Sequence, residues 1–346
     1  MKCKDCDCCK PITITRWSKK EGFMVEKQVH QCVGTKEPFV IENINTECTE
    51  RRYIKKQEQP IERKTNMNKK DSLGDRMKNN YENRAKTYLT RRTPVIIRLD
   101  GKAFHSFTKG FKRPYDEIFH SAMNQTLQYL CENIQGCKFG YTQSDEITLV
   151  LTDYDTLTTD GWFDYSVQKM CSVSASMATM AFNQYFAIEA HKYENDVHEA
   201  WNVSDDDYKY CDTLRKKMHS AMFDSRCFNI PEEEVTNCII WRQQDATRNA
   251  IQMLGQCNFS HKELDGKSCD DIQDMLMTQK GINFNDMPTE FKRGVCCIKN
   301  RMVCEPWGNR MLTSKVEDGK WFIDKEPPIF TQDREYVEIN FRGRKE

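Results

Sequence analysis

Two short acidic motifs have the residue types of a metal-dependent phosphoryl-transfer site. Arg98-Leu99-Asp100-Gly101-Lys102 ends an apolar run, and Gln143-Ser144-Asp145-Glu146 begins another. Carboxylates brought together from separate strands repel each other unless a cation lies between them, and oxygen ligands with few imidazoles or thiols suit Mg²⁺ beside substrate phosphates. We interpret Asp100, Asp145 and Glu146 as candidates for a two-metal site. The alternative is an Asp-Gly turn and a solvated Ser-Asp-Glu loop, which spacing alone favours.

Two further segments could contact a nucleotide or a nucleic acid. Residues 107–114 (FTKGFKRP) interleave two aromatic side chains with three basic ones, a composition that can stack a base and hold phosphates. Residues 241–249 (WRQQDATRN) place two arginines on a polar helix face. A basic loop and a solvated helix are the alternatives, and each is at least as common.

Composition excludes several classes of protein. The 346 residues include 52 basic and 52 acidic side chains, and no apolar run approaches the length of a membrane helix. The start of the chain has no apolar stretch, so we expect no secretory signal. An odd number of cysteines, 17, in such a chain argues against a disulfide scaffold and for a reducing, cytoplasmic location.

The first 50 residues form a separate cysteine-rich segment. The segment is too short to build a hydrophobic core alone, and a structural Zn²⁺ bound by its cysteines could stabilise it instead. Cys3, Cys6, Cys32 and Cys48 would complete a four-thiolate site, although Cys8, Cys9 and His30 compete as ligands. The alternative is a flexible cysteine-rich tail. Residues 51–70 are predicted to form a basic linker. Residues 51–92 carry 14 basic and five acidic side chains, which suggests a polyanionic partner.

The elements that would position the acidic motifs alternate between strands and helices. The pattern predicts helices over 71–89, 115–133, 162–190 and 238–280, strands over 95–99 and 147–151, and an irregular acidic region over 191–230. This order indicates an α+β layer, an antiparallel sheet with helices on one face. The predicted division is a cysteine-rich module (1–50), a linker (51–70), a catalytic domain (71–230) and a helical C-terminal domain (231–346).

The two acidic motifs, with Phe111 to Asp116 between them and Trp241 to Asn249 beyond them, resemble the histidine-tRNA guanylyltransferase family. The likeness is to its bacterial and phage-type branch, and it extends over roughly residues 69–340. It implies a polymerase-type palm joined to a helical second region. It also implies that nucleotides are added to the 5′ end of tRNA in the 3′–5′ direction, with ATP activating the 5′ end and GTP adding to it. Homo-oligomers, dimers or tetramers, are typical of the family.

The resemblance also assigns roles to residues. Two Mg²⁺ ions would be held by Asp100, Asp145 and the carbonyl of Gly101, with Glu146 near them. The nucleotide-binding positions would be Asp100, Gly101, Lys102, Ala103, Phe104, His105, Phe111, Arg113, Asp116, Ser144, Asp145, Lys169 and Lys267. RNA-contacting candidates are Asp245, Arg248 and Asn249.

One departure bears on the choice of substrate. Family members that add the extra guanosine to histidine tRNA carry a His-Ile-Asn-Asn stretch, where this chain has Thr247-Arg248-Asn249-Ala250. The difference favours the tRNA-repair branch. Two other hypotheses remain: a palm-fold enzyme that cyclises free nucleotides, and a non-catalytic RNA-binding protein. The basic stretch argues against the first, and retention of Asp100 and Asp145 argues against the second.

Overall fold

The computed structural model describes two units of the chain. In the first unit, residues 1–80, it describes the backbone of residues 9–18, 23–32 and 39–41 and the segment from residue 72. In the second, residues 81–346, it describes residues up to 200, then 203–299 and 319–342. The linker at 51–70 lies outside the described residues.

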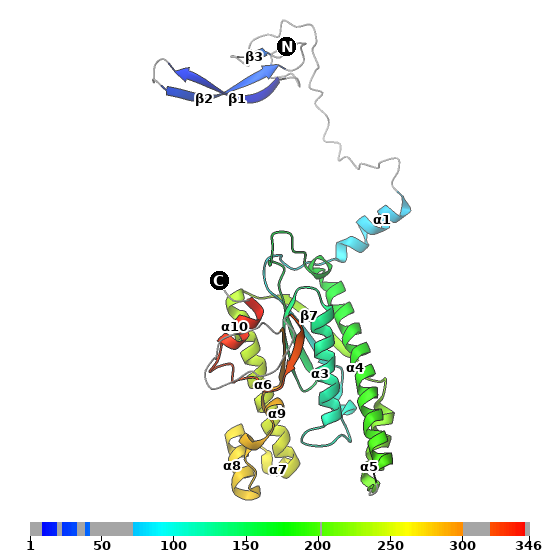
Figure 1. The fold of residues 1–346 in the computed structure, drawn as a ribbon. Coiled ribbons are helices and arrows are strands. Elements are labelled where there is room, and N and C mark those ends of the chain that lie inside the picture. Colours follow the sequence, from blue (N-terminus) through cyan, green and yellow to red (C-terminus); the bar gives the residue numbers. More distant parts are fainter. Residues whose placement is uncertain are drawn as a thin grey trace. The chain divides into compact units, whose positions relative to one another are not determined.

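The first unit contains a three-stranded antiparallel sheet and one helix (Figure 1). The strands are β1 (Cys9–Ser18), β2 (Phe23–Cys32) and β3 (Phe39–Ile41), and the helix is α1 (Leu73–Asn80). Cys9 and Cys32 are partners in the β1–β2 register. Cys3, Cys6 and Cys48 lie outside the described residues, so the zinc site stays a prediction.

The second unit is built on a six-stranded antiparallel sheet. Its spatial order is β7-β4-β6-β5-β8-β9. In chain order the strands are β4 (Val95–Gly101), β5 (Cys137–Gln143), β6 (Glu146–Leu151), β7 (Phe223–Asn229), β8 (Val295–Lys299) and β9 (Trp321–Asp324). The sheet confirms a mixed α/β fold, and β8 and β9 come from residues 231–346, so this segment shares the core of the catalytic domain rather than being helical alone.

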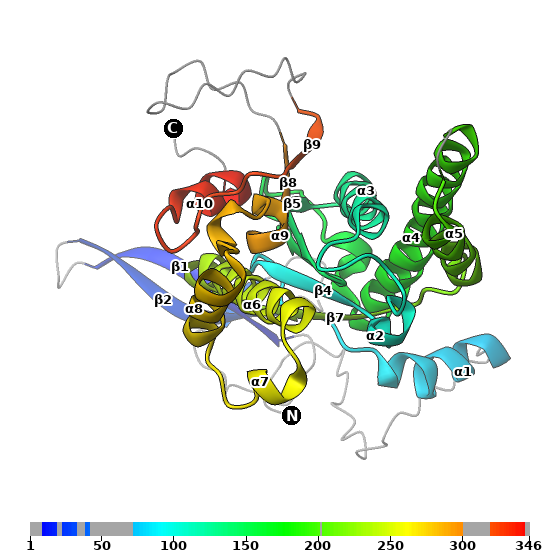
Figure 2. The same cartoon turned by 90° about the horizontal axis from the view of Figure 1, so that it is seen from below.

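Helices cover both faces of this sheet, not one face as expected (Figures 1 and 2). Side chains alternate between the faces of a strand. On β4, Val95, Ile97 and Leu99 are buried against α3 (Glu117–Asn133) and α4 (Val167–Glu199). Ile96 points to the opposite face and packs with α6 (Glu232–Asn258) and α10 (Glu335–Arg342). Arg98 and Asp100 share this second face, so the α6 side is where the acidic motif has to act.

The remaining helices are short, apart from α5 and α8. They are η2 (Glu82–Ala85), α2 (Phe104–Phe107), η3 (Trp162–Tyr165), α5 (Asp205–Lys217), α7 (His261–Leu264), α8 (Cys269–Lys280), η4 (Phe284–Asp286) and α9 (Thr289–Arg293). The end of α6 packs with α8, η4 and α9 around a small apolar cluster of its own that includes Leu254, Ile272 and Phe284. The predicted helix over 71–89 is shorter in the structure, since α1 ends at Asn80.

The acidic region over 191–230 is regular, contrary to the prediction. It contains the end of α4, all of α5 and the edge strand β7. Ser204 and Asp207 form a capping box at the start of α5, three acidic residues occupy its first turn and three basic residues its last. This distribution complements the helix dipole, so the charges stabilise a helix rather than indicate a loop.

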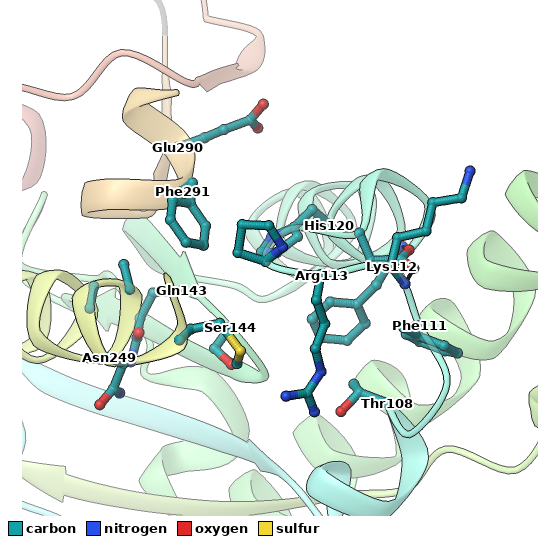
Figure 3. A pocket seen from close by; sticks show the side chains of 16 residues that line it. Thr108, Phe111, Lys112, Arg113, His120, Gln143, Ser144, Asn249, Glu290 and Phe291 are labelled. Atoms are coloured by element: carbon teal, nitrogen blue, oxygen red, sulfur yellow. Dashed lines mark hydrogen bonds between the residues drawn. The ribbon is translucent and has the colours of Figure 1, made fainter. Parts of the chain in front are cut away.

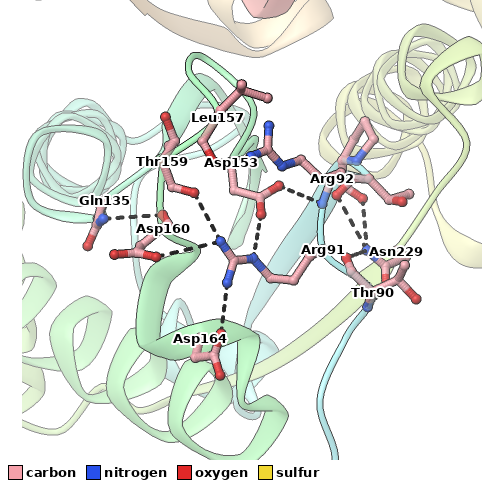
Figure 4. Close-up of polar contacts among 12 residues, drawn as sticks. Thr90, Arg91, Arg92, Gln135, Asp153, Leu157, Thr159, Asp160, Asp164 and Asn229 are labelled. Carbon is pink, nitrogen blue, oxygen red and sulfur yellow. Dashed lines mark hydrogen bonds and ion pairs between the residues drawn. The ribbon is translucent and has the colours of Figure 1, made fainter. Parts of the chain in front are cut away.

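A polar cluster fixes the end of the sheet where β4 begins, which is opposite the end that carries Asp100 (Figure 4). The Asp153 carboxylate is fully buried and accepts hydrogen bonds from the Arg91 side chain at 2.6 Å and the Arg92 N–H at 2.9 Å. Arg91 also bonds to Asp164. Because its buried charge is paired and hydrogen-bonded, Asp153 anchors this end of the sheet.

Within the part of the chain that the structure describes, no helix is both long enough and apolar enough to cross a membrane.

Candidate active site

Asp100 lies at the end of β4 between two other acidic residues. In the sheet register its partners are Glu146 on β6 and Asp224 on β7. Partial burial raises the pKa of Asp100, and the charges of Glu146 and Asp224 raise it further, against the opposing effect of Arg226 and Arg98. Carboxylates that raise one another's pKa in this way are stabilised when a cation binds between them.

Asp145 joins this group from the turn between β5 and β6. Ser144 takes a left-handed conformation (φ 50°), which brings the turn next to the end of β4. There the Gly101 N–H donates to the main-chain carbonyl of Asp145 at 3.1 Å. Burial raises the pKa of Asp145 to about 6, hydrogen bonds including that from Ser144 oppose the shift, and the charge of Asp100 adds to it. The structure therefore brings the two predicted aspartates together.

Glu146 is engaged differently from the two aspartates. Its carboxylate accepts a hydrogen bond from Arg98 at 3.1 Å and lies 3.3 Å from an Arg242 nitrogen. Glu146 is thus held by two arginines, one from β4 and one from α6.

Two members of the charged cluster were not predicted. Asp224 and Arg226 lie two residues apart on the same face of β7, and the Arg226 guanidinium lies 3.1 Å from Asp224 and 3.8 Å from Asp100. Both side chains are more than half exposed, so Arg226 is available to an anion that approaches Asp100. The period-two pattern of residues 223–229 could have indicated this strand.

The segment after Asp100 packs tightly against the core. Ala103 has a left-handed conformation (φ 56°), and Lys102 donates its N–H to the Met222 carbonyl at 2.9 Å. The Phe104 ring is buried and lies so close to Gly101 that a Cβ there would overlap it. The buried Phe104 ring therefore packs under the Gly101 backbone on the core side of the predicted nucleotide loop, while Lys102 and His105 are exposed.

A pocket opens beside the acidic residues (Figure 3). It is formed by the α2–α3 loop, the β5–β6 turn, α6 and α9. Five of the residues predicted to bind nucleotide or RNA line it: Phe111, Arg113, Asp116, Ser144 and Asn249. Figure 3 shows Arg113, Ser144, Asn249 and Phe291 arranged around this space. Aromatic and basic side chains on one wall match the stacking and charge pairing that a nucleotide requires.

Asp116 also has a structural role. It caps α3 by accepting from the Phe119 N–H at 3.0 Å, and it accepts from the Lys112 N–H at 2.9 Å and the Tyr210 hydroxyl at 2.5 Å. Only 4% of Asp116 is exposed. Its carboxylate therefore fixes the loop that carries Arg113.

Two predicted phosphate-binding lysines do not line the pocket. Lys169 is exposed in the first turn of α4, with its ammonium 5.6 Å from the Phe163 ring centre. Lys267 is exposed in the α7–α8 loop. A phosphate contact by either lysine stays a prediction.

The donor set suits Mg²⁺ rather than a transition metal. Among the described residues no group of three or more His, Cys, Asp and Glu side chains forms a complete metal site. Mg²⁺ does not require one, because it is commonly held by one or two carboxylates together with substrate phosphates and water. The raised pKa values of Asp100 and Asp145, each increased by burial and by neighbouring carboxylates, fit such an ion.

Comparison with known proteins identifies the family to which this chain belongs. The family model described as tRNAHis guanylyltransferase (Thg1) matches residues 74–231. A solved bacterial Thg1-like protein in complex with ATP is 42% identical, with a TM-score of 0.62, and the match covers 77% of this chain and 98% of that one. The chain belongs to the tRNAHis guanylyltransferase family. The resemblance seen in the acidic motifs is therefore confirmed.

Further comparisons show how far the likeness extends. The bacterial Thg1-like protein in complex with GTP is 39% identical with a TM-score of 0.58, over 78% of this chain and 99% of that one. The Saccharomyces cerevisiae tRNA(His) guanylyltransferase is 26% identical over 58% of this chain and 80% of its own length. An uncharacterised mimivirus protein is 27% identical over 71% of this chain and 84% of its own length.

Proposed function

We propose that this chain is a nucleotidyltransferase that adds nucleotides to the 5′ end of tRNA in the 3′–5′ direction. The observation that carries the proposal is the meeting of Asp100 and Asp145 beside a pocket lined by aromatic and basic side chains, in a chain of this family. The relatives in complex with ATP and GTP support binding of both nucleotides. The basic stretch over 51–92 supports a polyanionic substrate.

Mg²⁺ is the proposed cofactor. Asp100, Asp145 and the carbonyl of Gly101 would hold two ions, which when bound lower the pKa of an attacking hydroxyl and neutralise charge on the leaving group. The chain's own contribution is to position these oxygens. The Gly101–Asp145 hydrogen bond fixes the two segments relative to each other, and Arg226 offers charge-assisted donors to phosphate oxygens.

The reaction proceeds in two transfers. A tRNA 5′-monophosphate lacks a good leaving group, so AMP is first attached to it from ATP with release of pyrophosphate. The 3′-hydroxyl of GTP then attacks the activated 5′ phosphorus and expels AMP. Arg113 in the pocket, with Lys169 and Lys267 from more distant segments, would bind triphosphate oxygens.

The stretch that replaces His-Ile-Asn-Asn favours repair of tRNA ends over a dedicated histidine-tRNA reaction. Thr247 donates its hydroxyl to the Lys292 carbonyl at 2.9 Å, Ala250 is buried, and Asn249 lines the pocket. Arg248 and Asn249 are the exposed residues of this stretch and can contact a substrate with their polar side chains. We propose that the base to be added is chosen by pairing with the opposite strand, and that the protein acts as a homo-oligomer.

Incubation with labelled GTP, ATP, Mg²⁺ and a tRNA that lacks its first nucleotide tests the proposal. We expect a labelled product one nucleotide longer than the substrate. Cyclised GTP with unchanged tRNA would replace the proposal with a cyclase acting on free nucleotides. RNA binding without any change in tRNA or GTP would indicate a non-catalytic protein.

A further inference from the structure

Helix α6 places a buried arginine against the catalytic strands. The Arg242 side chain is only 4% exposed, and it lies between the Glu146 carboxylate, at 3.3 Å, and Asp245 one turn further along the helix. Burial alone would raise the pKa of Asp245, but the guanidiniums of Arg248 and Arg242 hold it below its usual value. Arg242 thus has an acid on each side.

Arg98 and Trp241 complete the arrangement. Arg98 reaches Glu146 from β4, and its guanidinium carbon lies 5.0 Å from the centre of the Trp241 ring. The Arg242 guanidinium carbon lies 4.1 Å from the same ring. The indole therefore contacts both arginines that hold Glu146, through cation–π interactions that restrict where each guanidinium can go.

This arrangement is not what stability alone would produce. The Nε of Arg242 is buried and has no hydrogen-bond partner among the described residues. Burying a guanidinium with an unpaired donor is costly, and an apolar side chain at such a position is often neutral or stabilising. A buried arginine paired with Glu146, the cross-strand partner of Asp100, calls for a functional explanation.

We propose that Arg242 is a positioning residue that holds the Glu146 carboxylate away from the metal-binding aspartates. Glu146 is the direct cross-strand partner of Asp100, so an unpaired Glu146 would lie within reach of the same cation. With Glu146 paired to Arg242 and Arg98, Asp100 and Asp145 meet the metal ions without a third competing acid. This inference rests on the proposed function, since it assumes that Asp100 and Asp145 bind the catalytic metals.

The inference predicts an unusual combination of effects. Removing the charge of Arg242 removes a positive charge near a divalent cation and frees an extra carboxylate, so metal binding becomes tighter. The bound ion shifts towards Glu146 and away from its productive position, so turnover falls. Damage to the fold would instead weaken metal binding and lower turnover together.

Binding of Mn²⁺, measured by calorimetry on the full chain with a non-hydrolysable GTP analogue, tests this directly. We expect Arg242→Gln to bind Mn²⁺ about three- to tenfold more tightly than the wild type, with kcat at least about tenfold lower. Arg98→Gln should change binding in the same direction, which keeps the test available if Arg242→Gln does not fold. Arg242→Lys keeps the positive charge, so its Mn²⁺ affinity and its kcat should both lie close to those of the wild type.

Two controls isolate the role of Glu146. Arg334→Gln removes a charge from a side chain that bonds to Asn237 on the same helix but touches no acid of the site, and should leave Mn²⁺ binding unchanged. In a Glu146→Gln background, Arg242→Gln should no longer tighten binding.

Unchanged or weaker Mn²⁺ binding in folded Arg242→Gln or Arg98→Gln would overturn the inference. So would tighter binding that persists in the Glu146→Gln background. These outcomes are separate from failure of the proposed function, which would appear as a wild-type protein that binds no Mn²⁺ or transfers no nucleotide.

Discussion

The Gly101 N–H donates to the main-chain carbonyl of Asp145 at 3.1 Å. This hydrogen bond joins the end of β4 to the turn between β5 and β6, and so joins the two segments that carry the proposed metal ligands. Because the link is between main-chain atoms, the relative position of Asp100 and Asp145 does not depend on either carboxylate. Conservative substitutions at these aspartates can therefore change chemistry while leaving the backbone in place.

The requirement for ATP should depend on the 5′ end of the tRNA. With a monophosphorylated tRNA, we expect addition of GTP only when ATP is present, because the 5′ phosphate needs an attached AMP as leaving group. With a triphosphorylated tRNA, ATP should be dispensable, since pyrophosphate already leaves readily. Gel separation of labelled products with and without ATP measures both, and equal dependence on ATP for the two substrates would contradict the activation step.

The base that is added should follow the opposite strand. A set of 5′-truncated tRNAs that differ in the base opposite the missing nucleotide should each gain the complementary nucleotide, because Thr247 to Ala250 replace the stretch associated with histidine-tRNA specificity. Sequencing of the extended products gives the answer. Guanosine added whatever base lies opposite, and only to histidine tRNA, would point instead to a dedicated guanylyltransferase.

Stability should fall in acid partly because of His120. Burial, and to a lesser extent Lys325, lowers the pKa of His120 to about 3, and its ring stacks on Tyr115. Between about pH 6.5 and 3 the unfolded chain therefore binds a proton that the folded protein does not, so this contribution is complete above pH 6.5 and is lost as pH falls. Since His120 also lines the pocket, which water can enter, we expect a loss of about 1–2 kcal/mol between pH 7 and 5.

Urea unfolding of the wild type and His120→Phe at pH 7 and pH 5 measures this contribution. The comparison cancels the other groups that titrate in this range. The stability of the wild type should drop more than that of the variant, by the amount given above. The same pH dependence in both proteins would show that His120 is not the cause.

Asp153 should matter for stability and not for nucleotide addition. Asp153→Ala removes a buried carboxylate that accepts hydrogen bonds from the Arg91 side chain and the Arg92 main-chain N–H, and we expect a loss of about 2–4 kcal/mol in the free energy of unfolding. Asp160→Ala is the matched control, because the Asp160 side chain is 85% exposed in the same cluster and its removal should change stability by less than about 0.5 kcal/mol. Urea denaturation distinguishes them.

Activity of folded Asp153→Ala, assayed below its unfolding range, should be close to that of the wild type. Asp153 lies beyond the end of β6 that pairs with the start of β4, while Asp100 is at the other end of β4. A large loss of kcat in a folded variant would mean that the two ends of the sheet are coupled.

Local sequence patterns predicted the strands that are buried on both faces and the helices that bury one apolar face. The apolar runs before Asp100 and after Glu146 are buried strands, and the helix predicted over 115–133 is α3. The helix predicted over 162–190 is α4, which begins at Val167 and continues to Glu199. These segments are dominated by apolar spacing, which depends little on partners.

Apolar spacing gives only a weak signal for the edge strand β7 and for helix α5. β7 has only one neighbour, β4, and its outward residues Asp224 and Arg226 are polar, so its apolar content is low. α5 is stabilised by its capping box and by its charge distribution. Both features are visible in the sequence, but the acidic composition of this region led to the prediction of irregular structure.

The pairing of Glu146 with Arg242 could not be predicted from the sequence either. It depends on how α6, nearly one hundred residues later in the chain, lies across the sheet face that carries Asp100. From the sequence, Asp145 and Glu146 were both candidates for the metal site. The structure brings both close to Asp100, and only the tertiary arrangement shows that arginines hold one of them.

The most direct measurement for the account is single-turnover addition of labelled GTP to a triphosphorylated tRNA that lacks its first nucleotide, with saturating Mg²⁺. We compare the wild type with Asp100→Asn and Asp145→Asn, each checked for an unchanged unfolding midpoint and unchanged tRNA binding. The account predicts extension by the wild type and a loss of at least about a thousandfold in rate for each variant, because neither amide can replace the carboxylate as a metal ligand. Extension by either folded variant within about tenfold of the wild-type rate would contradict the assignment of Asp100 and Asp145 to the catalytic metals.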